Sequence, residues 1–376
     1  MQFARLSIDP DLFLKGVRPW VECESPSWDA AAVSRMMDKA AKHLHRMGAA
    51  VRTIPGEKGF GNCVFADFAP QIAAPGILIL GHLDTVHPLG TIHGELPWRE
   101  ADGRCYGPGL YDMKGGNYLA LEALRMLLAN GLTPELPVRV LFTPDEESGS
   151  PSARHLIEEA ARGAKYVLVP EGAEPNGNLV IGRFPVARFQ VITRGKSSHA
   201  LLQPGEARSA LTAMARLVPR IEALASPECS VAVNFLQSGH PIAAVPTEAL
   251  CGVVSTARSE ERIEQLVSEL QAVVVAEAAE GGEVRTYTRR PIWHASERDR
   301  ALWAHAKALA DDIGFSFDHH MAFGGSDGNF TGALGIPTLD CLGPVGANAH
   351  QLTENIEIAS IEPRGRLLAG LLATLR

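Results

Sequence analysis

A short apolar run, residues 77–80 (Ile-Leu-Ile-Leu), leads directly into Gly81, His82, Leu83 and Asp84 and limits the folds open to this chain. A continuous apolar run of this length predicts a buried strand. Side chains alternate between the two faces of a strand, so His82 and Asp84 are expected on the same side of its end. One ring nitrogen of His82 could then bind a cation while Asp84 holds the other. The alternative is a strand end with two solvated polar residues.

Strand-like and helix-like stretches alternate through the first half of the chain. Apolar residues at helical spacing predict helices over residues 30–47 and from about 115 to 130, and β-rich runs predict strands over residues 137–142 and 166–170. This alternation predicts an α/β layer whose mixed sheet is mostly parallel and flanked by helices. A polar cluster follows each expected strand, at the end where α/β sheets gather ligands.

The pattern changes near residue 182, and 376 residues are too many for one ordinary core. The order strand, helix, strand, strand, helix, strand is that of a ferredoxin-like α+β domain. The α/β pattern resumes after Arg290 and Pro291. We therefore expect a catalytic α/β domain built from residues 1–181 and 292–376, with a smaller α+β domain, residues 182–291, inserted between the two parts.

Composition excludes several classes of protein. The formal charge of −8 argues against a nucleic-acid binder, which would usually present a basic face. Charged residues interrupt the first 20 positions, and no apolar run approaches the length needed to span a membrane. The six cysteines are scattered and include no Cys-x-x-Cys pair, so a thiolate zinc site is not indicated. The sequence predicts a cytoplasmic protein with no nucleic-acid or membrane partner.

Five imidazole and carboxylate donors lie at expected strand ends or in loops, namely His82, Asp112, Glu147, Glu171 and His350. These donor types, without thiolate, suit Zn²⁺, Mn²⁺ or Co²⁺ in a hydrolytic site. Five protein ligands are too many for one tetrahedral zinc ion that keeps a water, but they suit two ions that share one carboxylate. Glu146 would remain available as a general base. His87 has no partner in this pattern, and we expect it to have a structural role in its loop.

The chain resembles the M20 family of metallopeptidases, which includes glutamate carboxypeptidase, acetylornithine deacetylase and succinyl-diaminopimelate desuccinylase. The resemblance covers nearly the whole chain, and its motifs occur in family order. They are residues 81–86 (Gly-His-Leu-Asp-Thr-Val), 109–116 (Gly-Leu-Tyr-Asp-Met-Lys-Gly-Gly) and 145–150 (Asp-Glu-Glu-Ser-Gly-Ser), with the surroundings of Glu171, His199 and His350. The resemblance implies that the inserted domain is a lid that also forms a homodimer.

The resemblance also implies a role for each motif residue. One metal ion would be held by His82 and Glu171, the other by Glu147 and His350, and Asp112 would bridge them. In addition, Asp84 would orient His82, and Glu146 would carry a proton from the attacking water to the leaving amine. The peptide bond after Asp112 is expected to be cis.

Substrate-binding residues are implied in the lid and near its end. His199 matches a lid histidine that stabilises the oxyanion in a neighbouring subunit. Arg290 matches an arginine that holds the substrate's carboxylate, which a guanidinium does well through paired hydrogen bonds. A salt-bridged strand-end arginine is the alternative for that position. Ser326 and Asp327 would border the same pocket.

The lid departs from the pattern of carboxypeptidase-like relatives in two places. Ala243 stands where they often carry Asn, and Ser255 ends a stretch where they tend to have Asp-x-Arg. His240 is a candidate to supply a polar group there instead. The substituent that is recognised is therefore expected to differ.

Three functions remain open at this point. The first is a dinuclear metallohydrolase that cleaves a peptide or N-acyl amide bond next to a free carboxylate, with zinc as the expected metal. The second is metal-dependent hydrolytic removal of an amino group from a non-amide substrate on the same scaffold. The third is a non-catalytic binding protein, which the six intact residues of the expected site argue against. Neither the acyl or amino-acid substrate nor the native metal follows from the sequence.

Overall fold

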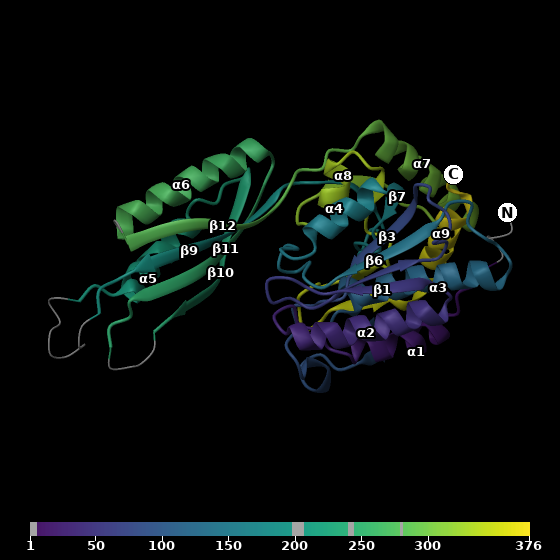
Figure 1. Ribbon diagram of the computed structural model, residues 1–376, viewed down its shortest axis with the longest axis horizontal. Coiled ribbons are helices and arrows are strands. Elements are labelled where there is room, and N and C mark those ends of the chain that lie inside the picture. Colours follow the sequence, from purple (N-terminus) through teal and green to yellow (C-terminus); the bar gives the residue numbers. More distant parts are fainter. Residues whose placement is uncertain (1–5, 198–206, 240–243, 279–280) are drawn as a thin grey trace. The chain divides into compact units, whose positions relative to one another are not determined.

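The computed structural model describes residues 6–197, 207–239, 244–278 and 281–376, and it forms two compact units (Figure 1). Unit 1 consists of Met1–Arg183, His294–Ala322 and Ser326–Arg376. Unit 2 consists of Phe184–Trp293 and Phe323–Gly325. Unit 1 is thus assembled from both ends of the chain.

The elements of unit 1 alternate along its first part and resume after unit 2. Its helices are α1 (Pro10–Val21), α2 (Ala30–Arg46), α3 (Gly115–Ala129), α4 (Arg154–Arg162), α7 (Glu297–Ile313), α8 (Gly328–Ala333) and α9 (Ile361–Thr374). Its strands are β1 (Ala50–Ile54), β2 (Cys63–Asp67), β3 (Gly76–His82), β4 (Arg99–Ala101), β5 (Arg104–Tyr106), β6 (Val138–Thr143), β7 (Ala164–Leu168), β8 (Leu179–Arg183), β13 (His319–Ala322), β14 (Thr338–Leu339), β15 (Gly346–Ala347) and β16 (Asn355–Glu357).

A six-stranded sheet in the order β1-β2-β6-β3-β7-β14 forms the centre of unit 1. Strands β6, β3, β7 and β14 are parallel to one another, whereas β2 is antiparallel to β6 and β1 is antiparallel to β2. A smaller antiparallel sheet, β15-β16-β5-β4, lies elsewhere in the unit. The largely parallel mixed sheet confirms the fold class expected for the catalytic part of the chain.

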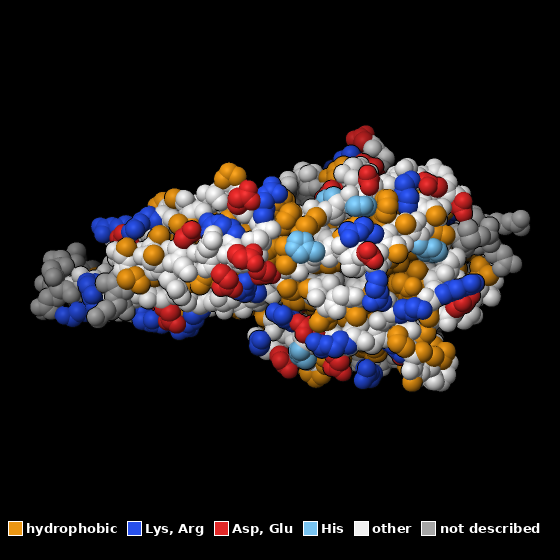
Figure 2. All heavy atoms as spheres, turned by 90° about the horizontal axis from the view of Figure 1, so that it is seen from above, with side chains coloured by type: hydrophobic (Ala, Val, Ile, Leu, Met, Phe, Trp, Pro, Cys, Tyr) orange, Lys and Arg blue, Asp and Glu red, His pale blue; other side chains and the backbone are white. Residues whose placement is uncertain are grey.

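Unit 2 has the β-α-β-β-α-β order of a ferredoxin-like domain, which confirms the expected lid fold. Its sheet runs β10-β11-β9-β12, and each neighbouring pair is antiparallel. Charged side chains of both signs lie on its surface (Figure 2). Its elements are β9 (Val186–Arg194), α5 (Ala210–Glu222), β10 (Cys229–Ser238), β11 (Glu248–Ala257), α6 (Glu260–Ala278) and β12 (Gly282–Arg290).

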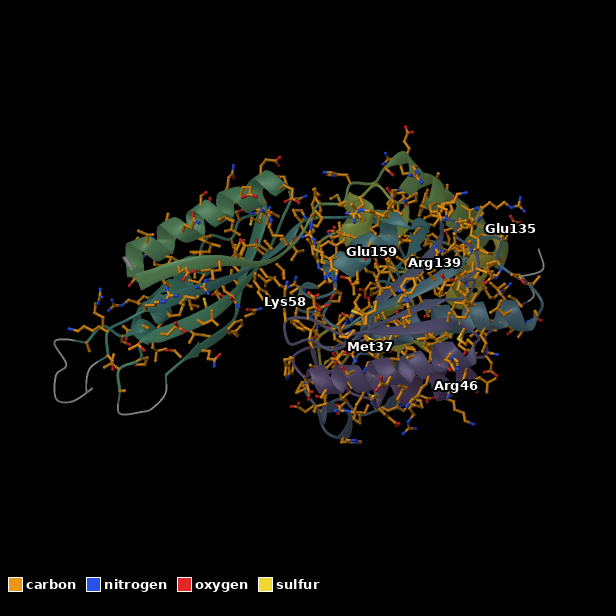
Figure 3. All side chains as sticks on the ribbon, viewed as in Figure 1. Met37, Arg46, Lys58, Glu135, Arg139 and Glu159 are labelled. Carbon is orange, nitrogen blue, oxygen red and sulfur yellow. The ribbon has the colours of Figure 1, made fainter. Side chains whose placement is uncertain are left out.

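Strand β3 is buried along its full length because apolar side chains cover both faces of the sheet. Ile77 and Ile79 pack in a large core with residues of α1, α2, α3 and α9. Leu78 and Leu80 point to the other face and pack with residues of α4. Met37 of α2 belongs to the large core, whereas Arg46 ends that helix at the surface (Figure 3). A strand covered on both sides brings His82, its last residue, to a fixed position.

Helix α1 was not among the helices expected from the sequence. Asp9 caps its first turn by accepting hydrogen bonds from the backbone of residues 11 and 12, and Pro10 follows as its first residue. Both are ordinary signals for the start of a helix. No helix in the described part of the chain has the length and apolar character needed to cross a membrane.

Candidate metal centre

His82 is the last residue of β3. Asp84 holds one nitrogen of its ring, and the other nitrogen faces Asp112 and Glu171. Its Nδ1 donates a hydrogen bond to the backbone carbonyl oxygen of Asp84 at 2.9 Å and lies 3.4 Å from that residue's Oδ1. A carbonyl oxygen only accepts, so Nδ1 carries hydrogen and Nε2 is the nitrogen left for a cation. Asp84 therefore orients the ring in the way expected for a metal-binding histidine.

The carboxylate of Asp84 connects three segments of the chain. It accepts hydrogen bonds from the hydroxyl of Ser27 at 2.6 Å, the backbone N–H of Glu146 at 3.2 Å and that of Glu147 at 3.3 Å. Asp84 is fully buried, and a buried carboxylate is tolerated because such donors satisfy it. The same side chain thus fixes both His82 and the start of the acidic loop after β6.

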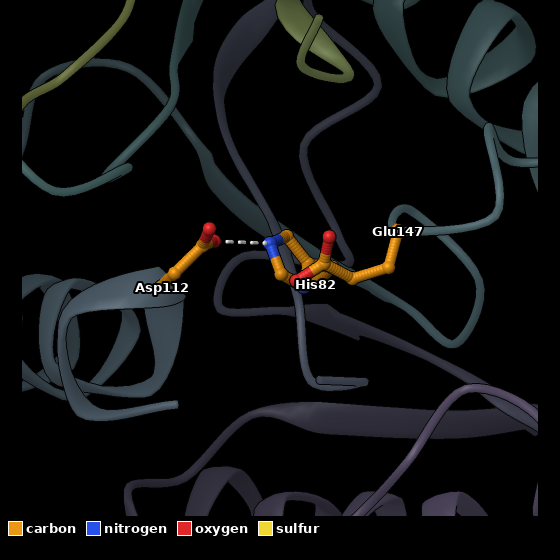
Figure 4. Close-up of side chains that lie close together, drawn as sticks. All are labelled: His82, Asp112 and Glu147. Atoms are coloured by element: carbon orange, nitrogen blue, oxygen red, sulfur yellow. Dashed lines mark hydrogen bonds and ion pairs between the residues drawn. The ribbon is translucent and has the colours of Figure 1, made fainter. Parts of the chain in front are cut away.

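Asp112 lies between two histidines. Its Oδ1 is 3.1 Å from His82 Nε2, and its Oδ2 is 3.2 Å from His350 Nε2. The peptide bond from Asp112 to Met113 is cis, as the family resemblance implied. His82, Asp112 and Glu147 each offer one ligand atom within 4.8 Å of the others, and their side chains converge in Figure 4.

Glu171 and Glu147 complete the cluster, each beside one of the two histidines. Glu171 Oε1 lies 3.7 Å from His82 Nε2, and Glu147 Oε2 lies 3.0 Å from His350 Nε2. His350 has a positive φ of 64°, a conformation that few residues other than glycine adopt and that places its ring here. All five ligand candidates from the sequence are therefore brought together.

The charges of the cluster shift the pKa values of its members. Burial would lower the pKa of His82, but hydrogen bonds to Asp112 and Asp84 outweigh it and raise that pKa well above the usual value. Hydrogen bonds to Asp112 and Glu147 raise the pKa of His350 to about 11. Burial and the negative charge of Asp112 raise the pKa of Glu147 to about 8 and that of Glu171 well above its usual value. So much buried negative charge calls for cations.

The donor spacing fits first-row divalent ions. Zinc binds imidazole nitrogen and carboxylate oxygen at about 2.0–2.2 Å, so neighbouring ligand atoms of a tetrahedral site are roughly 3.3 Å apart. The four separations between histidine nitrogens and carboxylate oxygens range from 3.0 to 3.7 Å. Imidazole and carboxylate are also the donor types that these ions prefer. The residues therefore fit a zinc-type centre in both chemistry and spacing.

The remaining site candidates either are not among the ligand candidates of this cluster or lie outside the described residues. His199 and His240 belong to the latter group, as does Ala243. Arg290 is buried at the end of β12 in unit 2, where its backbone is paired with Val186.

Ser326 and Asp327 are buried in unit 1. The Ser326 hydroxyl donates to Asp340 Oδ2 at 2.5 Å. Asp327 accepts hydrogen bonds from the hydroxyls of Thr143 at 2.9 Å and Ser150 at 2.5 Å. That these two residues border the substrate pocket stays a prediction.

Sequence reasoning missed several buried groups that support the ligands. The Asn117 side-chain amide donates to the backbone carbonyl of His82 at 2.6 Å. A side chain on Gly81 would put its Cβ 2.0 Å from Asn117 Oδ1, which explains the glycine before the histidine. Ser27 and Glu354 are two further supports that the motifs do not contain. Only the convergence of distant backbone segments identifies them.

An α/β sheet with imidazole and carboxylate donors gathered at its strand ends is the arrangement of a metal-dependent hydrolase. The sequence pattern of peptidase family M20/M25/M40 matches residues 78–374, and this chain belongs to that family. It is therefore a metallohydrolase of the group that acts on peptide or N-acyl amide bonds.

Known relatives agree with this assignment. Carboxypeptidase G2 from Pseudomonas sp. (strain RS-16) is 28% identical over 374 residues, which cover 96% of this chain and 89% of the relative. Succinyl-diaminopimelate desuccinylase from Alkalilimnicola ehrlichii is 27% identical over 322 residues, 80% of this chain and 84% of the relative. The crystal structure of human carnosine dipeptidase 1 has the same fold, with a TM-score of 0.77 at 16% identity over 97% of this chain and 96% of that chain.

Proposed function

We propose that this enzyme uses two metal ions to hydrolyse a peptide or N-acyl amide bond next to a free carboxylate. The observation that carries the proposal is that the two oxygens of Asp112 face different histidines, at 3.1 Å from His82 and 3.2 Å from His350. Glu171 adds a carboxylate near His82, and Glu147 adds one near His350. Each end of Asp112 thus has one imidazole and one carboxylate, which is a ligand set for two ions with a shared bridge.

Bound ions would activate water and polarise the amide carbonyl. Glu146 takes a proton from the attacking water and delivers it to the departing nitrogen, the work of a general base that becomes a general acid. Its backbone N–H donates to Asp84 Oδ1 at 3.2 Å, so the carboxylate that orients His82 also positions the base. Burial and the charge of Asp112 are the main causes of the raised pKa of Glu171, and the negative charge of Glu146 adds to them.

The substrate side of the proposal rests on Arg290. A guanidinium can bind a carboxylate through two parallel hydrogen bonds, and a lysine cannot reproduce that geometry. We assign Arg290 the free carboxylate and His199 the oxyanion, and we expect the substrate to be a small molecule. An Arg290→Lys variant should raise KM for a carboxylate substrate more than it lowers kcat.

The test combines metal analysis with a substrate panel. Zinc-, manganese- and cobalt-loaded protein should each hold two ions per chain and hydrolyse N-acyl amino acids or dipeptides. The matched control replaces the free carboxylate of the best substrate by a carboxamide, and its turnover should fall sharply. One ion per chain would contradict the dinuclear centre. Equal turnover of the carboxamide would contradict carboxylate recognition, and release of ammonia from aromatic amines alone would favour the deaminating alternative.

We also propose that the chain forms a homodimer through unit 2. Strand β10 is an edge of the sheet formed by the described residues, and an uncovered edge strand can pair with a second chain. Phe235 and Leu236 on β10 are 45% and 42% exposed, so this edge strand presents two adjacent large apolar side chains to solvent. Analytical ultracentrifugation should find a dimer, and replacing both residues by Lys should yield monomers. A monomeric parent protein would overturn the proposal.

A further inference from the structure

Glu354 is a buried carboxylate whose two oxygens each accept two hydrogen bonds. Oε1 accepts from the backbone N–H groups of Tyr111 at 2.8 Å and Asp112 at 3.1 Å. Oε2 accepts from the backbone N–H of Gly109 at 3.1 Å and from His87 Nε2 at 2.7 Å. One side chain therefore holds the loop that carries the bridging carboxylate.

Strand register explains how Glu354 reaches that loop. Strand β16 is antiparallel to β5, and Asn355 is the partner of Tyr106. Glu354 precedes Asn355, so it lies beside the chain that continues from Tyr106 toward Gly109. The same short segment begins at His350, four residues before Glu354. The backbone of Glu354 thus belongs to the segment of His350, whereas its side chain is hydrogen-bonded to the loop of Asp112.

His87 connects Glu354 to the third ligand loop, which is that of His82. It follows Asp84 by three residues, in the segment that leaves His82 at the end of β3. Its ring is 5% exposed, and its Nε2 contacts only a carboxylate oxygen of Glu354 among the hydrogen bonds of the described residues. Glu354 therefore joins the loops of His82, Asp112 and His350.

We propose that Glu354, with His87 as its partner, is a positioning residue that sets Asp112 between the two histidines before any cation binds. This inference rests on the proposed metal centre. Asp112 is bound through its backbone N–H to Glu354 and presents its carboxylate oxygens to His82 and His350. Groups of this kind behind metal ligands determine how well the ligands are preorganised, and losing one typically costs about 10–100-fold in metal affinity or activity.

The hydrogen-bond count shows why a carboxylate is required. Four donors point at two oxygens, and a glutamine in place of Glu354 would offer only one oxygen together with an NH₂ group that donates. Facing Tyr111 and Asp112, that NH₂ would meet two N–H groups. Facing His87 and Gly109, it could donate to a neutral imidazole but would still oppose the N–H of Gly109. Each orientation leaves at least one buried donor without an acceptor.

The experiment compares Glu354→Gln with Glu357→Gln in the full-length protein. Glu357 lies three residues further on, and its side chain is 40% exposed in a surface ion pair with Arg104. Metal is removed with a chelator, and zinc is then titrated calorimetrically. Glu354→Gln should weaken zinc binding about 10–100-fold, whereas Glu357→Gln should match the parent protein.

A second readout separates positioning from general stability. In the metal-free protein, amide hydrogen exchange at Gly109 should be at least about tenfold faster in Glu354→Gln, since exchange reports local opening. Its Tm without metal should fall below that of Glu357→Gln, because a buried donor is left without an acceptor, but the variant should remain folded at the titration temperature. Unchanged exchange and zinc affinity would overturn the inference, and so would exchange that becomes faster throughout unit 1 to the same degree as at Gly109.

His87 variants keep the proposal testable if Glu354→Gln does not fold. His87→Ala leaves Glu354 its three backbone donors, so zinc affinity should fall less, and His87→Gln should restore part of it by supplying another N–H donor. Equal zinc affinity in His87→Ala and the parent protein would overturn the role of His87. If the parent protein binds no zinc, the proposed metal centre fails; if it binds zinc and the variants bind equally well, only the positioning role fails.

Discussion

The two units of the molecule differ in how many charged side chains they bury. In unit 1, His82, Asp84 and Glu354 have at most 1% of their surface exposed, and each is satisfied by hydrogen bonds to other buried groups. In the described part of unit 2, Arg290 is the one fully buried charged side chain. The other charged residues of that part are at least partly exposed, many of them in ion pairs near the surface such as that of Arg194 with Glu283.

This difference indicates where the chemistry is located. Burying charge is expensive unless the groups are paired and hydrogen-bonded, so a buried cluster of charged donors needs a functional reason to exist. Surface ion pairs cost little and contribute little. The proposed reactive centre therefore lies in unit 1, whereas unit 2 consists of two helices and a sheet around an apolar core.

The largest expected effect is on catalysis in unit 1. Glu146→Gln keeps the shape of the side chain but removes the base, so kcat should fall about 10²–10⁴-fold. Metal content should stay at the parent level, because Glu146 is not among the five proposed ligands. Glu158→Gln, a change to an acidic residue of the nearby helix α4 that pairs with Arg154 at 2.8 Å, is the control and should leave kcat unchanged. Near-parental turnover of Glu146→Gln would rule out the assigned base.

The next largest effect is expected on the free energy of unfolding of unit 2, with no change in zinc affinity. Leu270 of α6 is fully buried in the core of unit 2, and Leu270→Ala should lower the free energy of unfolding by about 2–5 kcal/mol. Val275, on the same helix, is 61% exposed, so Val275→Ala should have little effect. Urea unfolding measures both. Zinc affinity should be unchanged in the folded Leu270→Ala protein; a parallel loss of zinc binding would show that the two units are not separable in this way.

Three of the five ligand candidates, His82, Glu147 and Glu171, were predictable because they lie at the end of, or soon after, strands with a clear apolar pattern. The apolar run before His82 and the strand before Glu146 and Glu147 are local signals, and parallel strands bring their carboxyl ends to one edge of a sheet. The order of the expected elements also predicted an α/β part and a ferredoxin-like part of the chain. The number of expected donors, five, also suggested that more than one ion could be held.

The supporting residues were not predictable in this way. Glu354 reaches Asp112 only because β16 pairs with β5, a contact between segments some 250 residues apart. Ser27 reaches Asp84 from the segment before α2, and no motif marks it. Nor did the sequence reveal the buried partners of Ser326 and Asp327, which are the carboxylate of Asp340 and the hydroxyl of Thr143. Burial of polar groups is a non-local property, which a single sequence does not reveal.

Metal binding should depend on pH in unit 1. In the metal-free protein, hydrogen bonds to Asp112 and Glu147 raise the pKa of His350 to about 11, so at pH 7 this histidine holds a proton that a metal ion must displace. Zinc affinity should therefore rise with pH, by about tenfold per pH unit for each proton released. Calorimetry between pH 6 and 8, in buffers of different ionisation enthalpy, measures both the affinity and the protons. An affinity independent of pH, without proton release, would contradict the charge balance inferred for this cluster.

The smallest effect is expected at the surface of unit 2, where the comparison is sharpest. Arg220 of α5 lies 2.9 Å from Glu277 of α6, and its side chain is 42% exposed. Water screens such a pair, so Arg220→Ala should change the free energy of unfolding by no more than about 1 kcal/mol and leave zinc affinity untouched. A double-mutant cycle with Glu277→Ala, followed by urea unfolding, isolates the pair. A coupling as large as the loss expected from Leu270→Ala would mean that unit 2 also depends on its charges, and the contrast between the units would then no longer locate the chemistry.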